Sequence, residues 1–415
     1  MSKTAAPQAP LSQPEPGLDA ATLIERAAAL KPLLYAQQES SDRLGRYSDE
    51  VDDAFRQAGL YRIMQPRLYG GYQLPPEVFL KVVMEIARGH PAASWCYTLA
   101  ASHGYFVGAH WPRQSQDELF GPDGEFAAAH VVGPFGTMTR AEGGYTVDGV
   151  FPFCSGITVS THFIGGSLAP QTGGPPKHVF FCTPRETLAV LPDWGEGRFM
   201  GMQASGSNSV RLDNVFVPDR MVVDVNMMTS SEAFAAGSPG LKLHGDAMYQ
   251  VVLVGWFHCE FGAILSGTAR AALDEFETLA RTKMMINNPQ LTRMHDPFVQ
   301  LLYGQCLGLA DSARALTLAA VELYQDQLRK AARDQAPILP VDTFEVWGMA
   351  SNACKMACDA VERLFHAAGA SAGRHDQRLQ RYFRDVEMYR LHIQSQPLLP
   401  TTRGQVALGL PPGIF

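Results

Sequence analysis

The stretch that decides the fold is RLQRYFRDVEMYRLH, which runs from Arg378 to His392. At helical spacing its apolar side chains fall on one stripe, made of Leu379, Tyr382, Phe383, Val386 and Tyr389. Charged side chains such as Arg384 and Asp385 stand beside or opposite that stripe. The pattern therefore predicts an amphipathic helix over residues 379–394, close to the end of the chain.

Hydrophobic periodicity divides the rest of the chain into three regions. Helical spacing dominates over about 19–119, short β-rich runs with turn residues between them fill about 126–223, and long helical patterns return over 241–394. Strands and helices do not alternate, so the fold class is α+β. We expect a disordered N-terminus (1–17), a helical domain (18–124), a central β domain (125–235), a helical bundle (236–396) and a Pro/Gly-rich tail (397–415).

Start signals and apolar spacing place the individual helices. Ser48-Asp49-Glu50 opens one helix, and Pro75-Pro76 precedes the next. Besides the helix over 379–394, the predicted segments are Leu18–Gln37, Val51–Leu60, Phe79–Ala87, Ala92–His110, Val251–Leu279, His295–Leu328 and Phe344–Ala368.

Composition excludes several classes of function. The chain has 415 residues, 46% apolar residues and a net charge of −7 that is spread along its length, so neither nucleic acid nor an anionic membrane is an expected partner. No apolar run approaches the roughly 20 residues that span a bilayer. Seven scattered cysteines fit a reducing cytoplasm, and Cys354 and Cys358 are expected to be small buried residues, so no metal site is predicted. No Rossmann or P-loop glycine motif is visible.

Four stretches in order resemble the acyl-CoA dehydrogenase superfamily. They are GGYTVDGVFPFCSGI from Gly143, WGEGRFMGMQASGSNSVRLDNVFVPDRMV from Trp194, LARTK around Arg281, and QRYFRDVE in the stretch quoted first. The resemblance covers most of the chain. It implies an N-terminal helical domain, a central β-barrel-like domain and a C-terminal four-helix bundle.

Two departures point to a branch of that superfamily. The position of the dehydrogenase glutamate is Ile393, and the loop that should bind CoA phosphate reads AAAHVVGPFGTMTRA. A dehydrogenase needs a carboxylate to remove the α-proton of its substrate, and Ile393 cannot do this. The combination resembles the flavin-dependent monooxygenases that share the fold, in which reduced flavin adds O₂ at C4a and the protein keeps water away.

The resemblance also implies cofactor-binding residues. Ser155 is the candidate for the contact at flavin N5, and Ser205 and Ser207 are candidates for flavin oxygens, with loop serines as the alternative. Arg281 resembles a phosphate-binding arginine, although a surface arginine has the same sequence signal. In the family, that arginine and the corner that here holds Gly369 and Ser371 serve the flavin of a neighbouring subunit. A homo-oligomer, most simply a tetramer, is therefore expected.

Histidines are the candidate bases that activate the substrate. His392 stands beside the vacated glutamate position and ranks first, His103 second and His130 third. An imidazole that takes a phenolic or N–H proton raises the electron density of the ring to be hydroxylated. The oxygenase strand usually continues S-G-x-x-H, whereas this chain has Val159 at that position and His162 three residues later.

Three functions remain open from the sequence. The favoured one is the oxygenase component of a two-component monooxygenase, taking FMNH₂ (alternatively FADH₂) from a separate NAD(P)H-dependent reductase and hydroxylating a small aromatic or heteroaromatic molecule with O₂. The second is a FAD-dependent acyl-CoA dehydrogenase or oxidase with Glu260 as base. The third is a flavin-binding protein without catalytic activity.

Overall fold

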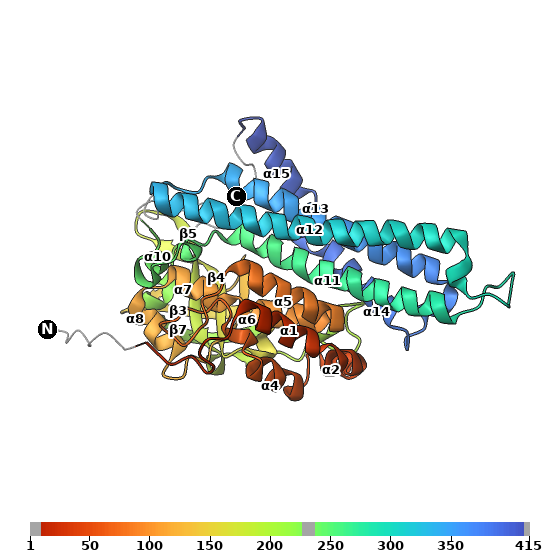
Figure 1. Ribbon diagram of the computed structural model, residues 1–415. Helices are drawn as coiled ribbons and strands as arrows, with labels where there is room; N and C mark the ends of the chain where they lie inside the picture. The colour runs from red at the N-terminus through yellow and green to blue at the C-terminus, as the bar shows by residue number, and fades with distance from the viewer. Residues whose placement is uncertain (1–9, 226–236, 411–415) are drawn as a thin grey trace.

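The computed structural model describes residues 10–225 and 237–410, and its elements follow the predicted three-region order (Figure 1). The N-terminal region holds α1 (Ala20–Ala29), α2 (Lys31–Ala36), α3 (Gln38–Leu44), α4 (Asp49–Gln57), α5 (Pro76–Gly89), α6 (Pro91–Ala101), α7 (His103–His110) and α8 (Arg113–Phe120). Ser48 caps α4 by accepting a hydrogen bond from the Val51 N–H, as the start signal predicts.

The central region forms two four-stranded sheets. One has the order β1 (Ala128–Pro134), β4 (His162–Gln171), β5 (Gly174–Pro184), β8 (Val222–Val223), with β1 parallel to β4. The other has the order β2 (Thr137–Ala141), β3 (Gly144–Phe151), β7 (Val210–Pro218), β6 (Ala189–Val190). Phe151 of the second sheet contacts Phe163 and Phe181 of the first, with ring centroids 5.4 and 5.8 Å apart. The sheets therefore share an aromatic core, as a barrel-like domain does.

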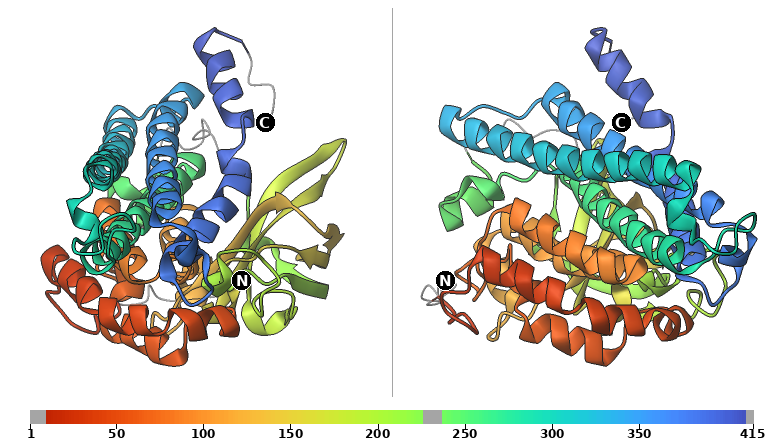
Figure 2. Two further views of the ribbon diagram at one scale, coloured as in Figure 1. Left: turned by 90° about the vertical axis from the view of Figure 1, so that its right-hand side faces the viewer. Right: turned by 45° about the vertical axis from the view of Figure 1, so that its right-hand side comes forward.

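The C-terminal region contains the predicted bundle. After α10 (Pro239–His244), the long helices α11 (Leu253–Thr282), α12 (Pro297–Asp334) and α13 (Pro340–Ala368) pack side by side with α14 (Arg378–Leu391). α5 packs on α11, so the bundle covers the N-terminal helices, while the sheets lie along one flank (Figure 2, left). One continuous hydrophobic core spans all three regions.

Four predicted boundaries differ from the structure. The segment 18–37 divides into α1 and α2, with Pro32 in the first turn of α2, because proline cannot donate the helical hydrogen bond. Residues 10–17, expected to be disordered, are anchored by Leu11, whose N–H donates to the Leu68 carbonyl. The tail contains the helix α15 (Leu398–Ala407), which packs on α13.

The fourth difference bears on function. The predicted helix over 92–110 breaks at Ser102 into α6 and α7. The His103 Nδ1 lies 2.6 Å from the carbonyl oxygen of Leu99, the oxygen that a continuous helix would give to the backbone N–H of residue 103. Competition between side chain and backbone for one carbonyl explains the break.

Candidate active site

Three of the predicted flavin-contacting serines lie together. The Ser155 Oγ is 2.8 Å from the Ser207 Oγ, and the Ser207 Oγ is 2.6 Å from the Ser205 Oγ. The Trp95 Nε1–H donates to the Ser155 Oγ at 3.1 Å. Ser155 is half-buried, whereas Ser205 and Ser207 are buried. We call Ser155, Ser205 and Ser207 the serine string; its one partly exposed hydroxyl, on Ser155, is the one that can reach a ligand.

Backbone contacts fix the segment that carries Ser205 and Ser207. The Gly156 N–H donates to the Ser205 carbonyl at 3.0 Å, and the Met202 N–H donates to the Asp385 Oδ1 at 2.6 Å. A Cβ on Gly201 would lie 2.2 Å from the Arg384 carbonyl oxygen, so only glycine allows this approach. The Arg384-Asp385 pair of α14 thus holds the loop that supplies two members of the serine string.

An aromatic group stands beside the serine string. Phe153 has φ 57° and is 61% exposed, and its ring lies 6.2 Å from those of both Trp194 and Phe199. A bulky residue in left-handed backbone is strained, and such strain tends to cluster at functional sites. The sequence gives no signal for Phe153, because its backbone conformation depends on the packing of the 152–156 turn.

A line of aromatic rings leads from the serine string into the molecule. Trp95 stacks on Phe261 of α11 at 4.9 Å and 8°. His392 contacts both rings, at 5.9 Å from Trp95 and 5.2 Å from Phe261. Burial lowers the pKa of His392 to about 4. This first-ranked histidine therefore lies at the serine string, next to the tryptophan that donates to Ser155.

His103 has a hydrogen-bonding arrangement that fixes its tautomer. Its Nδ1 is 2.6 Å from the Leu99 carbonyl oxygen and 2.7 Å from that of Ala128, so Nδ1 must carry the proton. The Nε2 therefore presents a lone pair. It is buried and has no hydrogen-bond partner among the described residues. Burial lowers the pKa of His103 to about 4, against the raising effect of the two carbonyls.

His130 faces His103 from β1. The two rings are 5.0 Å apart at 81°, and both contact Phe257 of α11. Burial lowers the pKa of His130 well below its ordinary value, helped by His103 and His178. Trp95 lies in α6, and His103 begins α7 after the break at Ser102. Phe257 contacts the His103–His130 pair, and Phe261, one turn later on α11, contacts His392, so the two histidine sites are neighbours along α11.

Glu260, the alternative base, is fully buried in α11. Burial raises the pKa of its carboxyl to about 8, although the Ser102 hydroxyl and the Trp256 indole act in the opposite direction. The carboxyl is therefore mostly protonated near neutral pH, which suits a proton donor better than a base.

Arg281, Gly369 and Ser371 lie elsewhere. Arg281 is about 30 Å along α11 from Phe261 at roughly 1.5 Å per residue, and it pairs with Glu277 at 2.8 Å on the exposed surface. The Lys283 Nζ donates to the Ser371 Oγ at 2.5 Å, which places the 369–371 corner at the same end of the bundle. Within one chain these residues do not meet the serine string.

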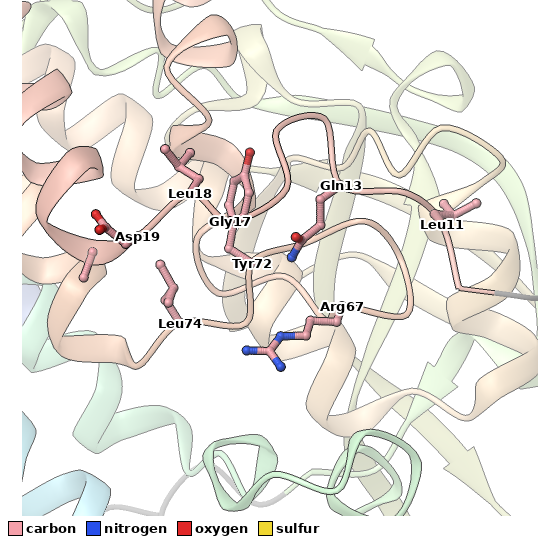
Figure 3. A pocket seen from close by; sticks show the side chains of 9 residues that line it. Leu11, Gln13, Gly17, Leu18, Asp19, Arg67, Tyr72 and Leu74 are labelled. Carbon is pink, nitrogen blue, oxygen red and sulfur yellow. The ribbon is translucent and has the colours of Figure 1, made fainter.

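Other features of the described residues lie away from this site. A surface pocket of about 490 Å³ contains no residue of the serine string or the histidine pair; it is lined by Leu11, Gln13, Gly17, Leu18, Asp19, Ala20, Arg67, Tyr72 and Leu74 (Figure 3). Among the residues that the structure describes, no group of three or more His, Cys, Asp or Glu side chains is arranged to hold a metal ion. Over the same residues, none of the helices combines the length and the apolar character needed to cross a membrane.

Comparison with known proteins finds a matching family model, similar proteins and a similar solved structure. Residues 260–397 match the family model of the acyl-CoA dehydrogenase C-terminal domain. The oxygenase subunit HsaA of a flavin-dependent monooxygenase from Rhodococcus jostii is 25% identical, covering 90% of this chain and 94% of its own. The oxygenase component of p-hydroxyphenylacetate 3-hydroxylase from Acinetobacter baumannii is also 25% identical, covering 91% and 86%.

A solved structure agrees with these relatives in fold. XiaF from a Streptomyces species, solved with FADH₂ and glycerol, superposes with a TM-score of 0.84 over 95% of this chain and 97% of its own, at 22% identity. The similarity covers the helical, sheet and bundle regions together. The chain has the acyl-CoA dehydrogenase fold, and along most of its length it is similar to oxygenase components of flavin-dependent monooxygenases.

Proposed function

We propose that the protein is the oxygenase component of a two-component flavin-dependent monooxygenase that hydroxylates a small aromatic or heteroaromatic substrate. The observation that carries the proposal is the serine string, with Trp95 donating to Ser155 at the place that we propose for the flavin. Its relatives are named as oxygenase subunits or components, which implies a separate NAD(P)H-dependent flavin reductase as a transient partner. Reduced FMN, with reduced FAD as the alternative, would be the cofactor and O₂ the co-substrate.

The residues at the serine string fit a reduced flavin. Ser155 offers a half-buried hydroxyl, Phe153 offers an exposed ring face beside it, and Gly201 lets the 201–209 loop lie close against α14. Ile393, which is 60% exposed, replaces the carboxylate that a dehydrogenase needs. When bound, reduced flavin would supply the activation of O₂. Ser155 would hold the flavin ring edge, and the apolar rings of Trp95 and Phe261 would limit access of water.

The histidines would handle the proton of the substrate. His103 holds Nδ1–H on two carbonyl oxygens, so its Nε2 can accept a proton from a hydroxyl or N–H, and the carbonyls then stabilise the imidazolium. We therefore assign His103 the role of base. His392 lies at the serine string and would act on the flavin side of the site.

A homo-oligomer, which we propose to be a tetramer, would complete the site. On α12, Phe298 is 82% and Leu301 61% exposed, and a Cβ on Gly304 or Gly308 would meet nothing within 4 Å. Such a smooth apolar helix face suits contact with a second copy. Arg281 and the 369–371 corner would then serve the flavin of a neighbouring subunit. We also propose a cytoplasmic location, since the seven cysteines are buried and free.

A coupled assay tests the proposal. The purified protein, a generic flavin reductase, NADH and either FMN or FAD are incubated with phenols, indoles and thioethers in air. We expect a hydroxylated product and substrate-dependent stimulation of NADH consumption with at least one of them. Formation of H₂O₂ alone across the whole set would contradict the proposal and favour a flavin-binding protein without activity. Reduction of bound FAD by an acyl-CoA would favour the Glu260 alternative, which gains no support from these relatives.

A further inference from the structure

The 201–209 loop, which supplies two members of the serine string, is held from two helices. On α14, the Asp385 Oδ1 accepts a hydrogen bond from the Met202 N–H at 2.6 Å. At the end of α3, the Gly45 carbonyl oxygen accepts a hydrogen bond from the Gly206 N–H at 2.8 Å. None of the loop residues carries a charged side chain. The position of the loop therefore depends on backbone contacts to both α3 and α14.

A buried ion pair joins these two helices. The Arg381 Nε of α14 donates to the Asp42 Oδ2 of α3 at 2.7 Å, and the two side chains are only 8% and 13% exposed. The Arg381 Nη1 also donates to the Gln38 Oε1 of α3 at 3.4 Å. Because a buried ion pair is costly to break, the guanidinium of Arg381 is committed to α3.

The Asp385 carboxylate, one turn further along α14, lacks such a partner. Asp385 is 2% exposed and forms no ion pair among the described residues, where its Oδ2 is buried without a hydrogen-bond partner. The neighbouring Arg384 directs its Nη1 to the Met200 carbonyl oxygen at 2.6 Å and its Nε to the Gln380 Oε1 at 2.8 Å. A buried carboxyl without a counter-charge tends to keep its proton, since the charged form loses its hydration.

Three charged groups act on Asp385. Arg381 and Arg384 on its own helix favour the charged carboxylate, whereas the negative charge of Asp42 on α3 disfavours it. Burial and Asp42 prevail, and together they raise the pKa of Asp385 to about 7. His90, which interacts with Arg381 from the start of α6, adds no charge near neutral pH, because burial lowers its pKa to about 3.

We propose that Asp42 and Asp385 form a pH-sensitive clamp on the 201–209 loop, which stays seated while Asp385 is protonated and is released when that proton leaves. Ionised Asp385 is a second buried negative charge beside Asp42, and lifting of the loop gives it water. The seated loop holds the proton more tightly than a hydrated carboxyl does. Raising the pH through about 7 therefore favours release. This inference goes beyond the proposed function, because it concerns the loop with or without flavin.

Quenching of Trp194 fluorescence by acrylamide tests the clamp in the protein without flavin. Trp194 is 8% exposed, and its Nε1–H lies 3.3 and 3.0 Å from the carbonyl oxygens of Met202 and Gln203, so it reports on this loop. We expect the quenching constant to rise at least about twofold between roughly pH 5.5 and pH 8.5, with a midpoint near pH 7. Trp194→Phe, which removes the reporter, should lose this rise.

Carboxyl variants separate the clamp from other titrating groups. Asp385→Asn keeps an oxygen acceptor but cannot ionise, so its quenching should stay at the low-pH level throughout. Asp42→Asn removes a negative charge and frees Arg381 to act on Asp385, so the midpoint should move to lower pH. Glu260→Gln is the matched control. Glu260 is another buried carboxyl with a raised pKa, but it lies in α11, so the rise should remain in this variant.

The outcomes distinguish the clamp from the proposed function. Quenching that does not change with pH in the folded parent, an undiminished rise in Asp385→Asn or in Trp194→Phe, or an unmoved midpoint in Asp42→Asn would overturn the clamp. Absence of the rise in a protein that hydroxylates its substrate overturns this inference alone. A pH-dependent loop whose release leaves the affinity for reduced flavin unchanged supports the clamp and contradicts the placement of flavin at the serine string.

Discussion

The Asp385 carboxylate accepts a hydrogen bond from the Met202 backbone N–H at 2.6 Å, joining the last bundle helix to the loop that carries Ser205 and Ser207. The two residues are far apart in sequence, and each lies in one of the stretches by which the fold is recognised. Gly201 lies directly on the Arg384 carbonyl at the same contact. The helix signature near the C-terminus thus positions the serine string through this bond and through Arg384, whose Nη1 donates to the Met200 carbonyl oxygen at 2.6 Å.

Replacing Asp385 should therefore weaken flavin binding. Asp385→Ala removes the acceptor of the Met202 N–H, and we expect reduced flavin to bind at least about tenfold more weakly, as loss of roughly 1.4 kcal/mol implies. Asp385→Asn keeps an oxygen acceptor and should bind nearly as the parent does. Anaerobic flavin titration measures both. Parent-like affinity in folded Asp385→Ala would show that the loop holds its position without this bond.

Ser155→Ala should uncouple NADH consumption from hydroxylation. Without the Ser155 hydroxyl the flavin loses a hydrogen bond, so activated oxygen should be lost as H₂O₂ both with and without substrate. The fraction of NADH that ends in product is the measurement. Trp95→Phe is the companion variant, because it removes the donor to Ser155 but keeps a ring to stack on Phe261. Trp95→Phe should also lower the fraction of NADH that ends in product, but by less than Ser155→Ala does.

His103→Ala should slow hydroxylation while leaving flavin binding intact. Loss of a general base costs about 10²–10⁴ in rate. Product formation should fall and H₂O₂ should rise only when substrate is present. His392→Ala is compared in the same single-turnover experiment, because His392 is the base that the sequence ranks first. A parent-like rate in His103→Ala together with a large loss in His392→Ala would reverse the roles assigned here.

Burial of Glu260 predicts a pH dependence of stability. Burial raises the pKa of its carboxyl from an ordinary 4.5 to about 8, so the folded state holds the proton more tightly. The stabilisation is complete below about pH 4.5 and is lost as the pH rises towards 8. Glu260→Gln cannot ionise, so at pH 8 its free energy of unfolding should exceed that of the parent. Each unit of difference between the folded and unfolded pKa corresponds to about 1.4 kcal/mol, so the gain should amount to several kcal/mol. Denaturant unfolding at pH 5 and pH 8 checks this. Glu142→Gln, on an exposed turn, should follow the parent at both pH values.

The exposed face of α12 predicts how copies assemble. Leu301→Glu places a charge in the proposed contact and should reduce the assembly to smaller species in light scattering. Leu168→Glu, at an exposed apolar position in β4, is the matched control and should leave the mass unchanged. An unchanged mass in Leu301→Glu would move the interface away from this helix face.

The hydrophobic periodicity of the sequence predicted the long helices. It could not predict contacts between segments that are far apart in the sequence. α11, α13 and α14 begin and end within a few residues of their predicted limits, because their apolar spacing and prolines are local signals. The break at Ser102 was missed, because it depends on His103 bonding to carbonyls of α6 and β1. The serines were found by resemblance, but Trp95, Phe153 and the His103–His130 contact arise only from packing.

The most direct test of the central claim is the origin of the oxygen atom in the product. The protein, a flavin reductase, NADH and flavin are incubated with an accepted aromatic substrate under ¹⁸O₂ in unlabelled water, and the product is analysed by mass spectrometry. The proposed monooxygenase activity predicts one labelled oxygen atom in each hydroxylated product molecule. A hydroxylated product whose new oxygen comes from water would contradict it.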